Sequence, residues 1–227
     1  RDLHSFPTRR ASDLRAGELD VIDDVAIEDL PRLRTAPRVR VESLSSLTVT
    51  YVHMDPAVQP FDDVRVRRAV HLALDRRQTV AELHSGHAVP SGQMVSRNVF
   101  GYAPDLKPVE RDLEAARRLL AEAGYEDGLD VTLEVRQGRR VEPLVRQLGE
   151  AGIRVAVRAR PWDETYALLL EKKAPFYLGA WVCTSGDAGD ALDRKFHTPD
   201  PELGYGDANH AGYSNPELDA LIQRTNT

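Results

Sequence analysis

The fold of this chain is decided by residues 131–181, which read VTLEVRQGRRVEPLVRQLGEAGIRVAVRARPWDETYALLLEKKAPFYLGAW. Short runs rich in valine and aromatic residues alternate here with amphipathic segments of about ten residues. The pattern predicts three strands and two helices, in the order 131–135, 141–150, 153–157, 162–171 and 176–181. Strands that alternate with helices of this length indicate βαβ units, in which right-handed crossovers place helices over the sheet. The chain is therefore assigned to the α/β class.

Two further helices are predicted upstream of this stretch. Asp62 and Asp63 are suitable N-caps for an amphipathic helix that runs to about Leu83. Asp112 caps a second helix, which Gly124 closes in the C′ position. In both segments the apolar residues recur three and four positions apart, so each helix has one apolar face.

The remaining segments contain strand candidates and a last helix. Residues 47–52 form a β-rich run, and residues 20–22 and 39–41 are shorter strand candidates. Residues 214–217, Ser-Asn-Pro-Glu, predict the start of a final helix. Serine is expected at its cap, with glutamate three residues later and proline in the first turn.

The composition excludes several classes of protein. The chain has 227 residues, of which 41% are hydrophobic and 29% are charged, and its formal net charge is −6. It has no run of about 18 apolar residues of the kind that spans a bilayer. A single cysteine, Cys183, excludes a disulfide scaffold and a zinc ribbon. Acidic and basic residues are interspersed, which argues against a nucleic-acid-binding face.

The familiar motifs of catalysis and cofactor binding are missing from the sequence. It contains neither H-E-x-x-H, nor the glycine-rich phosphate and dinucleotide loops, nor G-x-S-x-G. His84 and His87 lie three residues apart without a carboxylate at ligand spacing, so we interpret them as surface histidines. Cys183 and Asp187 leave a hydrolase open as a remote alternative, which would need a base that no sequence feature supplies. We expect no catalysis, no metal and no cofactor.

The end of the last predicted strand is locally unusual. Residues 179–190 read GAWVCTSGDAGD, so the strand ends in Trp181 and a loop of small residues and aspartates follows. In α/β folds ligands collect beyond the carboxyl ends of strands. A tryptophan there offers a flat apolar wall with one N–H donor, and the small residues leave room for a ligand. The alternative is a core tryptophan followed by an ordinary turn.

Both ends of the chain have features of a fragment, and at the far end the helix predicted at residues 218–223 stops after barely two turns. The first fourteen residues, RDLHSFPTRRASDL, have no hydrophobic period and resemble the translation of a common sequencing-adapter oligonucleotide. The alternative is a natural basic arm. We exclude residues 1–14 from the fold and expect the chain to be a piece of a longer one, whose signal segment is missing from it.

Residues 60–76, PFDDVRVRRAVHLALDR, resemble the P-F-x-D-x-x-V-R-x-A-x-x-x-A-x-D-R segment of the family 5 extracellular solute-binding proteins. These are the peptide- and oligopeptide-binding components of bacterial ABC importers. Four further segments match family motifs in the family's order, namely 86–90, 100–102, 112–124 and 213–219. The resemblance covers essentially residues 15–227.

The resemblance implies a periplasmic-binding-protein-like fold of the class II type, of which only part is present. Two large lobes close on a ligand by hinge motion in this fold. On that map residues 15–54 are the end of the first lobe, and residues 55–227 are the second α/β lobe, truncated at its C-terminus.

The resemblance also implies a ligand site. In peptide-binding relatives the motif G-W-x-x-D ends a strand at the cleft, and its aspartate pairs with the ammonium of the peptide. Trp181 is kept here, but Thr184 stands where the carboxylate would be. A zwitterionic peptide is then a poorer ligand, unless Asp187 substitutes from three residues further on. We expect Trp181, Thr184 and Asp187 to face the ligand.

The function implied is that of the substrate-binding component of an ABC importer. Such a protein captures a peptide-like or other small solute by lobe closure and delivers it to permease subunits in the membrane. The resemblance implies a periplasmic or extracellular, membrane-anchored location, for example as a lipoprotein, and a monomer without nucleic acid as partner. The alternative is the same module as the ligand-sensing domain of a cytoplasmic transcriptional regulator.

Overall fold

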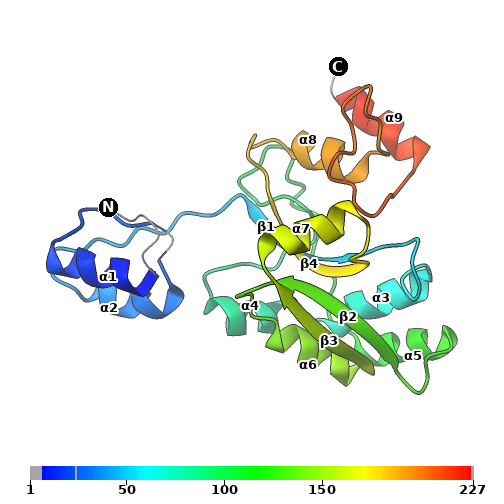
Figure 1. Ribbon diagram of the computed structural model, residues 1–227, viewed down its shortest axis with the longest axis horizontal. Coiled ribbons are helices and arrows are strands. Elements are labelled where there is room, and N and C mark those ends of the chain that lie inside the picture. The colour runs from blue at the N-terminus through cyan, green and yellow to red at the C-terminus, as the bar shows by residue number, and fades with distance from the viewer. Residues whose placement is uncertain (1–6, 24, 226–227) are drawn as a thin grey trace. The chain divides into compact units, whose positions relative to one another are not determined.

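The computed structural model describes residues 7–23 and 25–225 (Figure 1). The chain divides into two compact units, Arg1–Ser45 and Ser46–Thr227, which we call unit 1 and unit 2. Helices and a mixed sheet together confirm the α/β class. Within the described residues no helix has the length and apolar character needed to cross a membrane.

Unit 1 is helical. It contains α1 (Pro7–Ala16), the 3₁₀ turn η1 (Ile27–Asp29) and α2 (Leu30–Arg34). The strands predicted at residues 20–22 and 39–41 are wrong, because no strand forms within the described part of unit 1. A β-rich run becomes a strand only where a second strand supplies the ladder hydrogen bonds. Without such a partner, Val21 is left 83% exposed.

The boundaries expected from the sequence remain predictions. Residues 1–6 of the adapter-like stretch lie outside the described residues, and α1 continues past residue 14. The adapter interpretation of residues 1–14 and the lobe assignments of 15–54 and 55–227 stay predictions. Strand β1 (Thr48–Met54) belongs to unit 2, so the structural division falls at Ser45.

The core of unit 2 is a four-stranded mixed sheet in the order β1-β4-β2-β3 (Figure 1). β2 pairs in parallel with both β3 and β4, whereas β1 pairs antiparallel with β4. The β-rich run at 47–52 and the three strands expected downstream are all confirmed. The other three strands are β2 (Leu129–Arg136), β3 (Ile153–Arg160) and β4 (Phe176–Val182).

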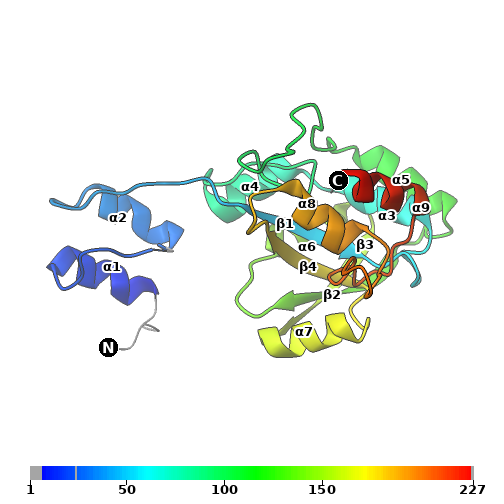
Figure 2. The same ribbon diagram turned by 90° about the horizontal axis from the view of Figure 1, so that it is seen from above.

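Three helices cover one face of the sheet. Alternate residues of β2, such as Leu133 and Val135, are buried beneath them, and Phe61 stacks on Phe176 with ring centroids 4.9 Å apart. Figures 1 and 2 show α7 (Trp162–Leu170) on the opposite side of the sheet. The three covering helices are α3 (Val64–Ala73), α5 (Leu113–Glu122) and α6 (Glu142–Glu150).

The helix expected from Asp63 to Leu83 is two helices. Asp63 caps α3 by accepting from Arg65 N at 2.7 Å, as predicted, but α3 ends at Ala73. Leu74 is extended, and Asp75 caps α4 (Arg76–His84) by accepting from Gln78 N at 2.9 Å. The Asp75 carboxylate accepts a hydrogen bond from the first turn of α4, and this cap stabilises a new helix start at Arg76. Two helices are therefore favoured over one continuous helix.

The other predicted helices are confirmed. Asp112 caps α5 by accepting from Ala115 N at 2.9 Å, and Gly124 follows the helix with φ +87°. A bare glycine adopts this left-handed conformation without the steric cost of a Cβ. Helices α6 and α7 lie close to their expected bounds.

The chain after β4 forms three short helical segments. The last of them confirms the predicted final helix but not its cap. The Asn215 side chain accepts from Glu217 N at 3.0 Å and from Leu218 N at 3.2 Å, whereas the Ser214 hydroxyl accepts from Thr198 Oγ1. Asparagine and serine are equally good caps, so adjacent candidates are not separated by residue type. The segments are α8 (Ala188–Ala191), the π-helical turn η2 (Leu192–Phe196) and α9 (Pro216–Thr225).

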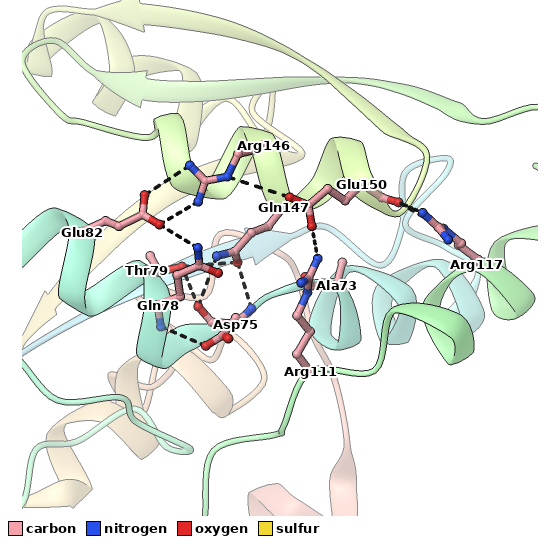
Figure 3. Close-up of polar contacts among 10 residues, drawn as sticks. All are labelled: Ala73, Asp75, Gln78, Thr79, Glu82, Arg111, Arg117, Arg146, Gln147 and Glu150. Atoms are coloured by element: carbon pink, nitrogen blue, oxygen red, sulfur yellow. Dashed lines mark hydrogen bonds and ion pairs between the residues drawn. The ribbon is translucent and has the colours of Figure 1, made fainter.

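A buried glutamine joins α6 to the break between α3 and α4 (Figure 3). Gln147, which is 1% exposed, accepts from Asp75 N at 2.8 Å and lies 3.4 Å from Thr79 Oγ1. Ion pairs surround it, Arg146 with Glu82 among them. The amide therefore satisfies a backbone N–H that the interrupted helix leaves without a helical partner.

Replacement of this amide should destabilise unit 2. We expect Gln147→Leu to lower the free energy of unfolding by about 1–3 kcal/mol, because the buried Asp75 N–H loses its acceptor. Urea unfolding of the full-length gene product measures the effect. Gln137→Leu, at an exposed glutamine, is the control and should change little. Equal stability of the two variants would contradict this account of the break.

Candidate functional site

The sheet has a topological switch point between β2 and β4. The chain passes from β2 to its neighbour β3 through α6, and then returns across β2 to β4 through α7 on the other face. The chain that leaves the carboxyl end of β2 runs through α6 to β3, whereas the chain that leaves the carboxyl end of β4 continues into α8 and η2, so the connections diverge between these two strands. Ligands of open α/β sheets bind in the crevice that this divergence leaves. The loop after β4, residues 183–187, begins at this point.

Internal hydrogen bonds hold this loop. Cys183 is fully buried, and its thiol donates to the carbonyl oxygen of Asp187 at 3.0 Å. Asp187 N donates to the Ser185 hydroxyl at 3.1 Å. The backbone of Phe100 pairs with both sides of the turn, donating to Gly186 O and accepting from Ala188 N. The loop is therefore a fixed surface, and Cys183 is a packing residue of it rather than an accessible nucleophile.

The three predicted site residues occupy different positions around this loop. Trp181 is half-buried at the end of β4, and its indole N–H is buried without a hydrogen-bond partner. Thr184 is exposed. Asp187 is also exposed, but its Oδ1 accepts from Gly189 N at 2.8 Å and caps α8. That Trp181, Thr184 and Asp187 face a ligand stays a prediction.

The indole of Trp181 lies beside a group of residues that the sequence does not single out. Lys195 Nζ lies 4.9 Å from the centroid of the Trp181 ring and 4.9 Å from that of Tyr51. The same ammonium donates to the Tyr51 hydroxyl at 2.8 Å. The hydroxyls of Tyr51 and Tyr177 are 3.3 Å apart, and His53 stacks on Tyr177 at 4.4 Å. We call these five residues the aromatic–lysine cluster.

The register of β1 and β4 brings the cluster together. Tyr51 and His53 are two residues apart on β1, so their side chains lie on the same face of the sheet. Residues 177, 179 and 181 of β4 are likewise two apart and share that face. His53 lies opposite Tyr177, and Tyr51 lies opposite Gly179. A Cβ at residue 179 would lie 2.6 Å from Cζ of Tyr51, so only glycine leaves room for the phenol.

The charges around the cluster are unevenly paired. Arg194 Cζ lies 5.1 Å from the centroid of the Trp181 ring, and the guanidinium is neutralised by Asp207, with Nη2 and an aspartate oxygen 2.8 Å apart. No carboxylate pairs with Lys195 within the described ranges 7–23 and 25–225. The cluster therefore carries a net positive charge.

Burial keeps the histidines near the cluster neutral. Burial first, and then the charge of Lys195, lower the pKa of His53 from 6.5 to about 4. The same two causes lower the pKa of His210. Burial also raises the pKa of the Tyr177 phenol, next to Tyr51.

The surroundings of Trp181 combine an aromatic surface with a cation. Among residues 7–23 and 25–225 no group of three or more His, Cys, Asp or Glu side chains could hold a metal ion. Two surface hollows of about 360 and 580 Å³ lie by the amino ends of β2 and β3, at the other edge of the sheet from Trp181. The arrangement at Trp181 offers an aromatic surface, a cation and a rigid loop, which together can hold a small polar solute.

These features define a solute-binding module. Residues 5–201 match the family described as bacterial extracellular solute-binding proteins, family 5 Middle. The chain therefore belongs to the family 5 extracellular solute-binding proteins, as the five sequence motifs indicate.

Two curated relatives resemble nearly the whole chain. Heme-binding protein A of Haemophilus influenzae is 26% identical over 227 residues, which cover 95% of this chain and 40% of that protein. Glutathione-binding protein GsiB of Escherichia coli strain K12 is 29% identical over 226 residues, which cover 94% of this chain and 43% of that protein. The chain thus spans about two fifths of the length of these relatives.

A solved structure shares the fold. The ABC transporter-associated periplasmic binding protein DppA from Helicobacter pylori, in complex with the peptide STSA, superposes with a TM-score of 0.80 at 19% identity. The match covers 96% of this chain and 43% of that one. The prediction of a periplasmic-binding-protein-like fold that is present in part is confirmed.

The buried imidazole predicts a pH dependence of stability. The unfolded chain takes up a proton on His53 as pH falls below 6.5, whereas the folded protein resists protonation until about pH 4. The stability contributed by neutral His53 is therefore present above pH 6.5 and lost as pH falls toward 4. We expect His53→Gln to remove about 2 kcal/mol of the stability loss seen between pH 7 and pH 5.

Urea unfolding of the full-length gene product at pH 7 and pH 5 measures this difference. His87→Gln, at an exposed histidine, should leave the pH dependence of the wild type unchanged. If His53→Gln loses as much stability on acidification as the wild type, His53 is not the group responsible.

Proposed function

We propose that this chain supplies one wall of the ligand cleft in the substrate-binding component of an ABC importer. The protein captures a small solute by lobe closure and delivers it to permease subunits in the membrane. It acts outside the cytoplasmic membrane, anchored to it, as a monomer and without catalysis. The observation that carries the proposal is the half-buried Trp181 at the switch point of the sheet, next to a loop fixed by hydrogen bonds.

Family membership supports the role but leaves the solute open. The named ligands of the similar proteins are heme, glutathione and a peptide, which differ in size and charge. Glutathione and the peptide share amide groups and carboxylates, so we propose a peptide-like solute. Trp181, Thr184 and Asp187 contact it, with Trp181 as the apolar wall.

Removal of the indole tests this role. In the full-length gene product we expect Trp181→Ala to weaken solute binding at least 100-fold, because a buried aromatic contact contributes about 3 kcal/mol or more. Calorimetric titration with the tetrapeptide Ser-Thr-Ser-Ala, glutathione and heme identifies the bound class first and then measures the loss.

Trp162→Ala is the matched control. Trp162 begins α7 and is 51% exposed, at a position separated from β4 by the intervening β2. It should bind as the wild type does. Undiminished binding by Trp181→Ala would remove Trp181 from the site, and no binding of any of the three solutes by the wild type would overturn the proposed peptide-like class.

A further inference from the structure

Lys195 is the cation of the aromatic–lysine cluster. The ammonium donates to the Tyr51 hydroxyl and lies 4.9 Å from the centroids of two aromatic rings, in a half-buried position on η2. No carboxylate pairs with it in the part of the chain that the structure describes. A partly buried cation without a counter-charge is costly, and aromatic faces compensate only part of that cost.

In the described part of the chain the adjacent Arg194, in contrast to Lys195, has carboxylate partners. Arg194 donates to Asp207 through Nε at 2.9 Å and through Nη2 at 2.8 Å, and Asp190 lies 3.8 Å away. Both cations lie against the same indole ring. Of Arg194 and Lys195, only Arg194 therefore has a carboxylate as its ion-pair partner among the described residues.

The tyrosine and histidine neighbours of Lys195 supply no negative charge. Tyr51 and Tyr177 share a hydrogen bond between their hydroxyls, and burial favours the neutral form of Tyr177. His53 and His210 are neutral bases at pH 7, since burial lowers the pKa of both. The cluster is thus a set of neutral rings around one ammonium.

The position at which the G-W-x-x-D motif has its carboxylate holds Thr184, a hydroxyl residue. The Asp187 carboxylate lies three residues further on, and its Oδ1 accepts from Gly189 N as the cap of α8. A solute ammonium would then lie near Lys195 without a counter-charge, which is unfavourable in a closed cleft.

We propose that the Lys195 ammonium binds an anionic group of the solute, a carboxylate, sulfonate or phosphate, beside the Trp181 ring. The solute presents no free ammonium at this position. The inference rests on the proposed function and names the charge class of its solute. Ammonium–anion hydrogen bonds between desolvated groups are strong, so loss of this one should weaken affinity about 10- to 100-fold.

Two pairs of probes test the inference on the full-length gene product. The first pair is N-acetyl-Ser-Thr-Ser-Ala, which keeps only the carboxylate, and Ser-Thr-Ser-Ala amide, which keeps only the ammonium. The second pair is glutathione and its dimethyl ester. Calorimetry should show that the wild type prefers the acetylated peptide to the amide and glutathione to its ester.

Variants then assign the preference to residues. Lys195→Met should weaken binding of the anionic probes about 10- to 100-fold and leave the amide and the ester unchanged. Thr184→Asp should shift the preference toward the amide, because it introduces a carboxylate at the position that the aspartate of the G-W-x-x-D motif occupies. Lys173→Met is the matched control, since Lys173 precedes β4 at its amino end, at the other edge of the sheet. Thermal unfolding confirms that each variant is folded.

The outcomes separate the two proposals. One outcome is that the probes bind while Lys195→Met weakens the binding of anionic and cationic probes equally, or weakens the binding of neither kind. In that case the inference fails while the proposed function stands. A carboxylate from elsewhere in the full-length protein would produce that result by pairing with Lys195 itself. If none of the four probes binds the wild type, the peptide-like class fails and the inference fails with it.

Discussion

The alternation of side chains along β4 determines which of its residues face the core of unit 2 and which face the aromatic–lysine cluster. Phe176 and Leu178 pack into the core beneath α3, α5 and α6, whereas Tyr177 and Trp181 lie on the opposite face with the aromatic–lysine cluster. In a strand each residue serves one face only. The same seven residues therefore anchor the core and carry Trp181, the proposed ligand wall, so packing around Phe176 also fixes the position of Trp181.

The βαβ part of the fold could be predicted because its signals are local. The strands and helices between β2 and β4 follow from apolar spacing within windows of about ten residues. The break between α3 and α4 does not, since the apolar spacing runs on through Leu74 and only Asp75, with Gln78 three residues later, marks a new start. The strand candidates in unit 1 have local β signals as well, but pairing is not a local property.

The candidate site likewise contains residues that could be predicted from the sequence and residues that could not. Trp181 could be proposed from the sequence because the end of a buried strand is recognisable within a few residues. Lys195 could not, because it meets Tyr51 from 144 positions away in the chain. That meeting depends on the antiparallel pairing of β1 with β4 and on the return of η2 over the sheet. Neither this strand pairing nor the position of η2 can be predicted from a single sequence.

The contact of Tyr51 with Gly179 also limits how β1 can slide along β4. A shift by one residue would turn every side chain of β1 to the wrong face. A shift by two residues keeps the faces but places Tyr51 opposite Tyr177 or Trp181, where an aromatic side chain replaces the hydrogen of Gly179. The missing side chain at residue 179 thus selects one alignment of the two strands and protects an edge strand against slippage.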